Sequence, residues 1–127
     1  MIKAIVLLRK LPHLSRQEFR RFWLEEHGPL VRSHAKARRI SKYVQVHPTG
    51  QEALDDIVRR RGGHALACDG IAEIYWDSLE DFLAAGRTPE GQRAVAEIVE
   101  HEKQFLELPS LQFYLGLEHT FVEPGGP

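Results

Sequence analysis

Residues 2–9 read IKAIVLLR, and this stretch is the best guide to the fold. Six of its eight side chains are apolar, and they follow one another without alternation. A short apolar run that is rich in β-branched residues is typical of a strand with both faces covered. Leu11 and Pro12 end the run. We therefore expect a strand near the N-terminus that needs a packing layer on each side.

The rest of the chain alternates between helix and strand patterns. Ser15 and Glu18 form a capping box, which predicts the start of a helix. Gly28 and Pro29 interrupt that helix, because Pro29 cannot donate a hydrogen bond to the carbonyl of Glu25. The further elements predicted by periodicity and caps are a strand at 39–47, a short helix at 51–61, a strand at 71–76, helices capped by Ser78 and Thr88, and a strand at 111–122.

The order β-α-β-β-α-β predicts a ferredoxin-like α+β fold, in which helices cover one face of a four-stranded antiparallel sheet. The strand at 2–9 offers apolar side chains to both faces, and a second copy of the same sheet is the simplest cover for the free one. We therefore expect a homodimer through the sheet face. We expect one domain over residues 1–123, with a loop and short helix inserted at 48–69 and a flexible tail at 124–127.

Composition is that of an ordinary globular domain: the chain has 127 residues, 43% apolar and 28% charged, with a net charge of −1. We expect neither nucleic acid nor a membrane as a partner, because the charges balance and no apolar run approaches the roughly 20 residues of a spanning helix. Residues 1–42 carry 11 basic and 3 acidic side chains, whereas residues 73–127 carry 3 and 11. These two halves either neutralise each other within a subunit or orient one subunit on another. Cys68 is the single cysteine, which fits the reducing cytoplasm.

Two histidines are the first candidates for chemistry. His27 follows Trp23 by four positions and so lies on the buried face of the first helix. It is either a core histidine whose hydrogen bonds are satisfied and which fixes the kink, or part of a binding site. Tyr43, Gln45 and His47 form one row on the strand at 39–47. This row faces His27 if it meets the helices, and it faces solvent if the strand is an edge.

Further polar and aromatic residues are candidates for the same interior. Glu73 and Tyr75 lie on one face of the strand at 71–76 and Trp76 on the other, and the pattern does not say which face is which. Glu118 and His119 on the last predicted strand are further candidates.

We expect no metal and no bound cofactor. The sequence contains neither His-x-His nor His-Glu-x-x-His, and a single cysteine excludes a cysteine-based zinc site. Gly62 and Gly63 follow no strand and open no helix, so they do not form a phosphate-binding loop. Nothing therefore indicates a nucleotide, nicotinamide or flavin.

Several segments, taken in order, carry a resemblance to a known family. They are Ser15-x-x-Glu18-Phe19-x-x-x-Trp23, Glu26-His27-Gly28-Pro29-Leu30-Val31, Tyr43-Val44-Gln45-Val46-His47, Asp69-Gly70-Ile71-Ala72-Glu73-Ile74-Tyr75-Trp76 and Glu118-His119. With them the chain resembles the EthD-like family of the dimeric α+β barrel superfamily over most of residues 2–123. The resemblance implies a subunit paired through its sheet into a barrel, with a pocket between sheet and helices. By similarity, His27, Tyr43 and His47 map onto pocket positions.

Three functions remain open at this point. The first is an enzyme without a bound cofactor, in which His27 and His47 exchange protons with an enolisable, phenolic or lactone-type molecule and Tyr43 binds its oxygen. Relatives in the superfamily include monooxygenases, dehydratases, cyclases and lactone isomerases. The second is a dimer that binds a small apolar or aromatic ligand without turnover, and the third is a purely structural dimer. The residues expected to contact substrate are Trp23, Gln45, Glu73, Tyr75, Trp76, Glu118 and His119.

Overall fold

The structure, a computed structural model of the chain, describes residues 1–50 and 52–125. Its elements are β1 Ile2–Leu8, α1 Arg16–Phe22, a π-helix Trp23–His27, α2 Gly28–Ser33, β2 Lys42–Val46, α3 Glu52–Arg60, β3 Gly70–Trp76, α4 Leu79–Ala85, α5 Pro89–Glu102, a 3₁₀ turn Leu108–Ser110 and β4 Gln112–Leu117. None of the helices described is long and apolar enough to cross a membrane.

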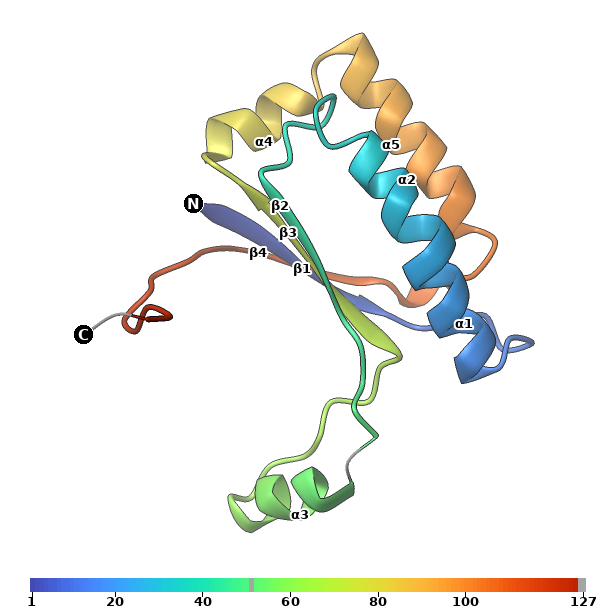
Figure 1. Cartoon of the computed structure of the whole chain (residues 1–127), viewed down its shortest axis with the longest axis vertical. Helices are drawn as coiled ribbons and strands as arrows, with labels where there is room; N and C mark the ends of the chain where they lie inside the picture. The colour runs from blue at the N-terminus through green and yellow to red at the C-terminus, as the bar shows by residue number, and fades with distance from the viewer. Residues whose placement is uncertain (51, 126–127) are drawn as a thin grey trace.

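The strands form one antiparallel sheet in the order β2-β3-β1-β4. β1 lies inside the sheet, with Ile2 opposite Trp76 and Leu8 opposite Gly70 on β3. Helices α1, α2, α4 and α5 lie on one side of this sheet (Figure 1). The predicted ferredoxin-like α+β fold is therefore confirmed.

Alternation along β1 separates the two faces of the sheet. Its helix-facing side chains are at most 6% exposed: Ile2, Ala4, Val6 and Leu8. Lys3, Ile5 and Leu7 point to the other face and are only partly buried. On the helix side, Phe19 and Trp23 are completely buried against the sheet. The helix layer thus builds the core and leaves the second face of the sheet to be covered by something else.

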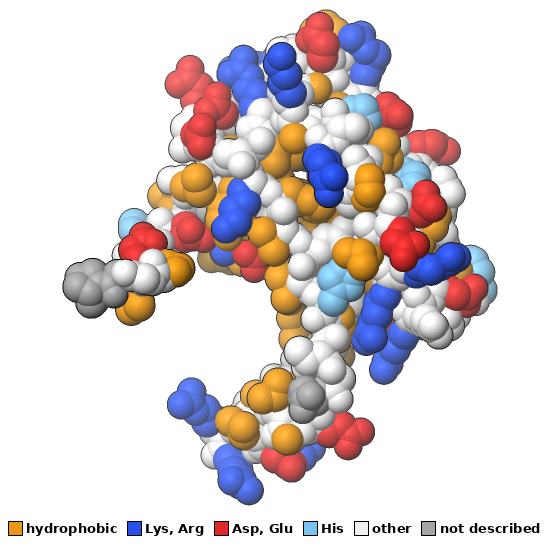
Figure 2. Space-filling view, in the orientation of Figure 1, with side chains coloured by type: hydrophobic (Ala, Val, Ile, Leu, Met, Phe, Trp, Pro, Cys, Tyr) orange, Lys and Arg blue, Asp and Glu red, His pale blue; other side chains and the backbone are white. Residues whose placement is uncertain are grey.

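The second face of the sheet is not covered by any helix in the described part of the chain (Figure 1). Figure 2 shows a hollow on this side, between the C-terminal tail and the arm that carries α3, with apolar side chains along its inner rim. Val46 on β2 and Tyr114 on β4 point to this face and are 43% and 67% exposed. An apolar face of this extent on a small domain marks an interaction surface.

The helix caps predicted from the sequence are confirmed. Ser15 Oγ accepts a hydrogen bond from the backbone N–H of Glu18 at 3.0 Å, and Glu18 Oε1 accepts one from the backbone N–H of Ser15 at 2.9 Å. Ser78 and Thr88 cap α4 and α5 in the same way. Local hydrogen bonding therefore sets where these helices begin.

Two predicted strand boundaries are wrong. The second strand begins at Lys42 and not at residue 39, because Arg39 has a positive φ of 56° and still belongs to the turn after α2. The last strand ends at Leu117 and not at residue 122, because Leu117 pairs with Ile2, the first residue of β1. Beyond that pair, no strand among the residues that the structure describes lies beside the chain to continue the ladder.

The segment 48–69 forms an arm that contains α3 and stands away from the sheet (Figure 1). No residue of α3 is buried. The helix predicted at 51–61 is observed at 52–60, and residue 51 lies outside the described residues. The last two residues of the predicted tail, 126–127, also lie outside them.

Candidate functional site

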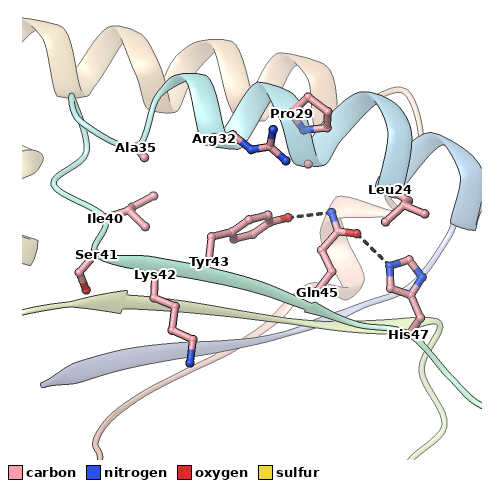
Figure 3. A pocket seen from close by; sticks show the side chains of 11 residues that line it. Leu24, Pro29, Arg32, Ala35, Ile40, Ser41, Lys42, Tyr43, Gln45 and His47 are labelled. Carbon is pink, nitrogen blue, oxygen red and sulfur yellow. Dashed lines mark hydrogen bonds between the residues drawn. The ribbon is translucent and has the colours of Figure 1, made fainter.

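A pocket of about 420 Å³ opens between α2 and β2 (Figure 3). Tyr43 and Gln45 point into it from the helix-facing side of β2, and His47 follows at the end of that strand. The predicted row of three polar side chains therefore meets the helices. The remaining walls include Leu24, Pro29, Arg32, Ala35 and Ile40.

Gln45 links the three residues of the row. Its Nε2 donates to the backbone oxygen of Trp23 at 2.9 Å and to the hydroxyl oxygen of Tyr43 at 3.1 Å. Its Oε1 lies 2.9 Å from Nε2 of His47 (Figure 3). Because a backbone carbonyl can only accept, the contact with Trp23 fixes which end of the amide carries the hydrogens.

This orientation defines the tautomer of His47. Gln45 Oε1 is an acceptor, so His47 Nε2 must carry the hydrogen and Nδ1 keeps its lone pair. The ring also packs against Trp23, with centroids 4.3 Å apart and the two ring planes tilted by 30°. Burial, and then the charge of Arg20, lower the pKa of His47 below its ordinary value. The neutral imidazole, with Nδ1 free to accept a proton, is therefore the form present at neutral pH.

The helix opposite the row is adapted to this contact. The interruption expected at Gly28 takes the form of a π-helix over Trp23–His27, in which the Gly28 N–H bonds to the Trp23 oxygen. That oxygen also accepts from Gln45. A Cβ on Gly28 would lie 3.1 Å from Gln45 Nε2, so the glycine permits the close approach. Single π-turns of this kind are frequent at functional sites.

Tyr43 stands at the boundary between two cavities. It lines the pocket and also a smaller chamber of about 40 Å³ on the inner side of the helix layer. Burial raises the pKa of its phenol, and the hydrogen bond from Gln45 opposes that rise. Its oxygen accepts from Gln45, and among the described residues no acceptor takes its own hydrogen. Tyr43 can therefore donate a hydrogen bond to a bound molecule.

His27 faces the chamber and not the pocket. It is 4% exposed, and its Nδ1 lies 3.0 Å from Nδ1 of His101. Burial, then the neighbouring His101 and the charge of Arg38, lower the pKa of His27 to about 4. The structure therefore does not bring His27 and His47 into one cavity, because Trp23 lines the chamber and packs against His47.

Several predicted substrate contacts lie elsewhere. On the uncovered face of the sheet, Lys3 Nζ lies 3.2 Å from Glu73, 3.2 Å from the hydroxyl oxygen of Tyr75 and 3.1 Å from Glu118. Alternation sends these side chains away from the helices, since Lys3 pairs with Tyr75 on the opposite side from the core. His119 is exposed beyond the end of β4.

Trp76 belongs to the core and not to the pocket. It is 1% exposed, packs edge-on against Phe82 and donates from Nε1 to the backbone oxygen of Arg38 at 2.8 Å. Its place opposite Ile2 puts it at the far end of the sheet from His47. This tryptophan therefore fixes the turn after α2.

Sequence reasoning missed the charged residues that line the chamber. Arg38 and Glu102 both face it. Glu102 could have been found, because it follows Ile98 by four positions and so shares the apolar face of α5. Arg38 lies in an irregular turn, and no periodicity marks it. His101, the partner of His27, directly precedes Glu102 on α5 and belongs to no motif that the sequence singles out. No group of three His, Cys, Asp or Glu among the described residues is placed to hold a metal ion.

A third cavity, of about 640 Å³, lies between the arm and α1. Its walls include Phe19, Arg20, Leu54, Leu66 and Cys68. None of the described arm residues, 48–50 and 52–69, lines the pocket that contains His47. The arm therefore borders this third cavity and not the pocket that contains His47.

The fold and the pocket together define a ferredoxin-like α+β protein with a cavity of small-molecule size. Similar solved structures include an EthD family protein from Bacillus halodurans C-125, with a TM-score of 0.60 and 20% identity, covering 94% of this chain and 100% of that one. A dimeric ferredoxin-like protein of unknown function from Thermobifida fusca YX has a TM-score of 0.54 and 14% identity, covering 91% and 88%. SnoaB, a cofactor-independent oxygenase from Streptomyces nogalater, has a TM-score of 0.56 and 7% identity, covering 97% of both.

At these identities the solved structures show the shared fold alone. No curated protein sequence matches the chain. The sequence profile of the EthD domain matches residues 11–109. The chain therefore belongs to the EthD family, which confirms the resemblance seen in its sequence.

Proposed function

We propose that this protein is a small-molecule enzyme without a bound cofactor, which moves protons on an enolisable, phenolic or lactone-type substrate in the pocket between α2 and β2. The observation that carries the proposal is the row of His47, Gln45 and Tyr43, which lines a pocket of about 420 Å³. A volume in this range suits a small organic ligand. Membership of the EthD family and the likeness to a cofactor-independent oxygenase support the proposal.

His47 is the base in this proposal. Its Nδ1 takes a proton from a carbon or hydroxyl group of the substrate, and the electron pair left behind forms an enolate or phenolate on the substrate. Tyr43 donates its hydroxyl hydrogen to the oxygen that gains this charge. Gln45 is a positioning residue, because it holds both rings and touches neither the base nitrogen nor the substrate oxygen. Proton transfer by a placed imidazole accelerates a reaction by roughly 10²–10⁴-fold.

The enolate or phenolate can continue along three routes. It reacts with O2 in a monooxygenase, expels water in a dehydratase or cyclase, or takes the proton back at another atom in an isomerase. All three routes begin with the same proton abstraction, so the row of residues serves each of them. Pocket shape and apolar walls such as Leu24 and Ile40 then favour a small apolar or aromatic molecule.

Turnover of a panel of phenols, β-diketones and lactones tests the proposal. We expect His47→Gln to lower kcat/KM by at least a hundredfold and Tyr43→Phe by a smaller factor, while the melting temperature of each variant stays close to that of the wild type. His13→Gln is the matched control, because His13 is exposed and lies outside the pocket. Full activity in His47→Gln would exclude the proposed base. Tight binding of panel members without any turnover would instead indicate a ligand-binding protein.

The pH profile provides a second measurement on the same substrate. Because burial and Arg20 lower the pKa of His47, the acid limb of kcat/KM should bend below the ordinary histidine value of 6.5. The limb should disappear in His47→Gln. A bend that persists in that variant would assign the titration to another group.

We further propose that the chain forms a homodimer through the uncovered face of its sheet. The apolar side chains on this face and the dimeric state named for the Thermobifida fusca relative support it. A stable interface buries roughly 1,600 Å² in total, which a four-stranded sheet can supply. We place the dimer in the cytoplasm, because a single cysteine that is not part of a disulfide fits a reducing compartment.

A further inference from the structure

The chamber behind Tyr43 combines an apolar lining with charged groups. Its volume is about 40 Å³, which is room for about three water-sized groups. Val6, Leu8, Ala72 and Ile74 of the sheet form one wall. The other wall holds His27, Arg38 and Glu102, which come from the π-helix, the turn after α2 and the end of α5.

Arg38 and Glu102 face this chamber without touching each other. No ion pair within 4.0 Å joins them, and among the described residues neither side chain makes a hydrogen bond. In the described part of the chain, the one charged or ionisable group within 4.0 Å of the Glu102 carboxyl group is His27 Nε2, at 4.0 Å, which is longer than a hydrogen bond. The Glu102 side chain is 18% exposed, so the chamber is not sealed.

In a structural ion pair, the guanidinium of Arg38 and the carboxylate of Glu102 would be in contact. Burying a guanidinium and a carboxyl group is costly unless they pair or bind something else. The ring of Trp23 also lines the chamber, and its buried Nε1 lies toward the hydroxyl group of Tyr43. The unused donors of Arg38 and the space beside them are the features of a binding site whose ligand supplies the missing acceptor atoms.

We propose that this chamber binds the carboxylate group of the substrate, with the fork of Arg38 on its two oxygens and the carboxyl group of Glu102 as a second hydrogen-bond donor. The guanidinium of arginine matches a planar carboxylate in geometry and charge. The space of about three water-sized groups suits one carboxylate and excludes a larger anion such as a diphosphate. The proposal deepens the proposed function, because it names a small carboxylic acid as the substrate class.

Tyr43 connects this chamber to the reacting part of the molecule. Its ring is a wall of both cavities, so a substrate with its carboxylate on Arg38 would extend past Tyr43 toward His47. The apolar body of the substrate then occupies the larger pocket.

The charges around Glu102 agree with its role as a donor. Burial raises the pKa of Glu102 to about 7, and the charge of Arg38 opposes the rise. The other titratable groups that face it are His27, which is neutral at pH 7, Tyr43 on β2 and His101 on its own helix. A bound carboxylate adds a negative charge beside Glu102 and favours its protonated form further. Binding at neutral pH should therefore take up a fraction of a proton, and this fraction should increase as the pH rises above 7.

Acetate is the probe for the test, because it fills the chamber without needing the larger pocket. We expect acetate to shift the indole N–H resonance of Trp23, and its dissociation constant to rise about tenfold between pH 6 and pH 8 as Glu102 ionises. Glu102→Gln should bind acetate equally at both pH values. Arg38→Gln should bind it at least tenfold more weakly at either pH. Acetamide, a neutral ligand of the same size, should show no pH dependence.

Matched control variants distinguish a failure of this proposal from a failure of the proposed function. Glu100→Gln on the same helix should behave as the wild type, since Glu100 is exposed and pairs with Lys103. His47→Gln should lose turnover and keep acetate binding, so failure of the proposed base does not affect this test. Acetate that binds Arg38→Gln as tightly as the wild type would overturn the proposal. Persistence of the pH dependence in Glu102→Gln would also overturn it, whether or not the Arg38 variant folds.

Discussion

At the scale of single residues, the helix layer depends on how closely Trp23 approaches the sheet. Its ring lies over Gly70 at the start of β3, where a Cβ would come within 2.4 Å of the indole carbon Cζ3. Trp23 is completely buried and cannot move aside. The absence of a side chain at Gly70 therefore places the ring that packs against His47.

Replacing this glycine should destabilise the fold. We expect Gly70→Ala to lower the free energy of unfolding by about 3 kcal/mol, because overpacking a rigid core forces side chains out of their rotamers. Urea unfolding measures the change. Gly86→Ala is the control: a Cβ there meets only Leu83 O at 3.6 Å, and its unfolding free energy should stay within about 0.5 kcal/mol of the wild type. Equal stability of the two variants would contradict the predicted clash.

Two residues of the chamber should give the stability opposite dependences on pH. His27 has a folded pKa of about 4, below its ordinary 6.5, so the unfolded chain takes the proton first and stability falls as the pH drops from 6.5 to 4. Glu102 has a folded pKa of about 7, above its ordinary 4.5, so its contribution is lost as the pH rises from 4.5 to 7. Between pH 4.5 and 6.5 the two slopes, each at most about 1.4 kcal/mol per pH unit, oppose each other.

Single variants should separate the two opposing dependences of the unfolding free energy on pH. Relative to the wild type, Glu102→Gln should gain stability more steeply with rising pH between 4.5 and 6.5, and His27→Gln should lose stability over the same interval. Urea unfolding at intervals across this range measures both, and subtraction of the wild-type curve removes all other titrations. Parallel curves for the three proteins would show that neither group titrates as its surroundings imply.

At the scale of elements, the sequence predicts best what neighbouring residues decide. The capping box of Ser15 and Glu18 and the alternation along β1 depend on contacts a few residues apart, and both are confirmed. The end of β4 at Leu117 depends on where β1 begins, at Ile2, so the local pattern predicts it too far along the chain. The π-helix over Trp23–His27 was expected only as a kink, because its register is set by the packing of Trp23 against the sheet and Gln45.

The arm helix α3 should be the least stable element. It has no buried residue, and a helix of this length gains most of its stability from packing. Amide hydrogen exchange should therefore be fastest in residues 52–60 and slowest in the central strand β1. The two rates are measured in one NMR experiment. Protection of α3 equal to that of β1 would show that the arm packs on another surface, such as a second subunit.

At the scale of the whole molecule, the unequal charges of the two halves are partly matched inside one subunit. Lys3 contacts Glu73 and Glu118, and Arg39 contacts Asp81 at 3.1 Å. These ion pairs join the basic residues 1–42 to the acidic residues 73–127. Of the two explanations open from the sequence, neutralisation within a subunit therefore accounts for a part of the charge asymmetry.

The uncovered face of the sheet should decide the oligomeric state. We expect light scattering at low micromolar concentration to give about twice the chain mass of 14.5 kDa. Leu7→Asp, on the uncovered face of β1, should shift the protein toward the monomer, because it buries an unpaired charge in the interface. Val95→Lys on α5, where Val95 is already 40% exposed, should leave the dimer intact. A wild-type protein that stays monomeric would remove the sheet-to-sheet interface.

The sequence by itself determined the order of elements, the ferredoxin-like class, the helix caps and the row of Tyr43, Gln45 and His47. Each of these follows from periodicity or from hydrogen bonds between near neighbours, which the chain carries locally. Only the tertiary structure decided that His27 meets His101 and that Arg38 faces Glu102 across a chamber. These residues lie far apart in the chain, and their distances depend on how α5 packs over the sheet. Packing is a property of all the core side chains together, and no single segment encodes it.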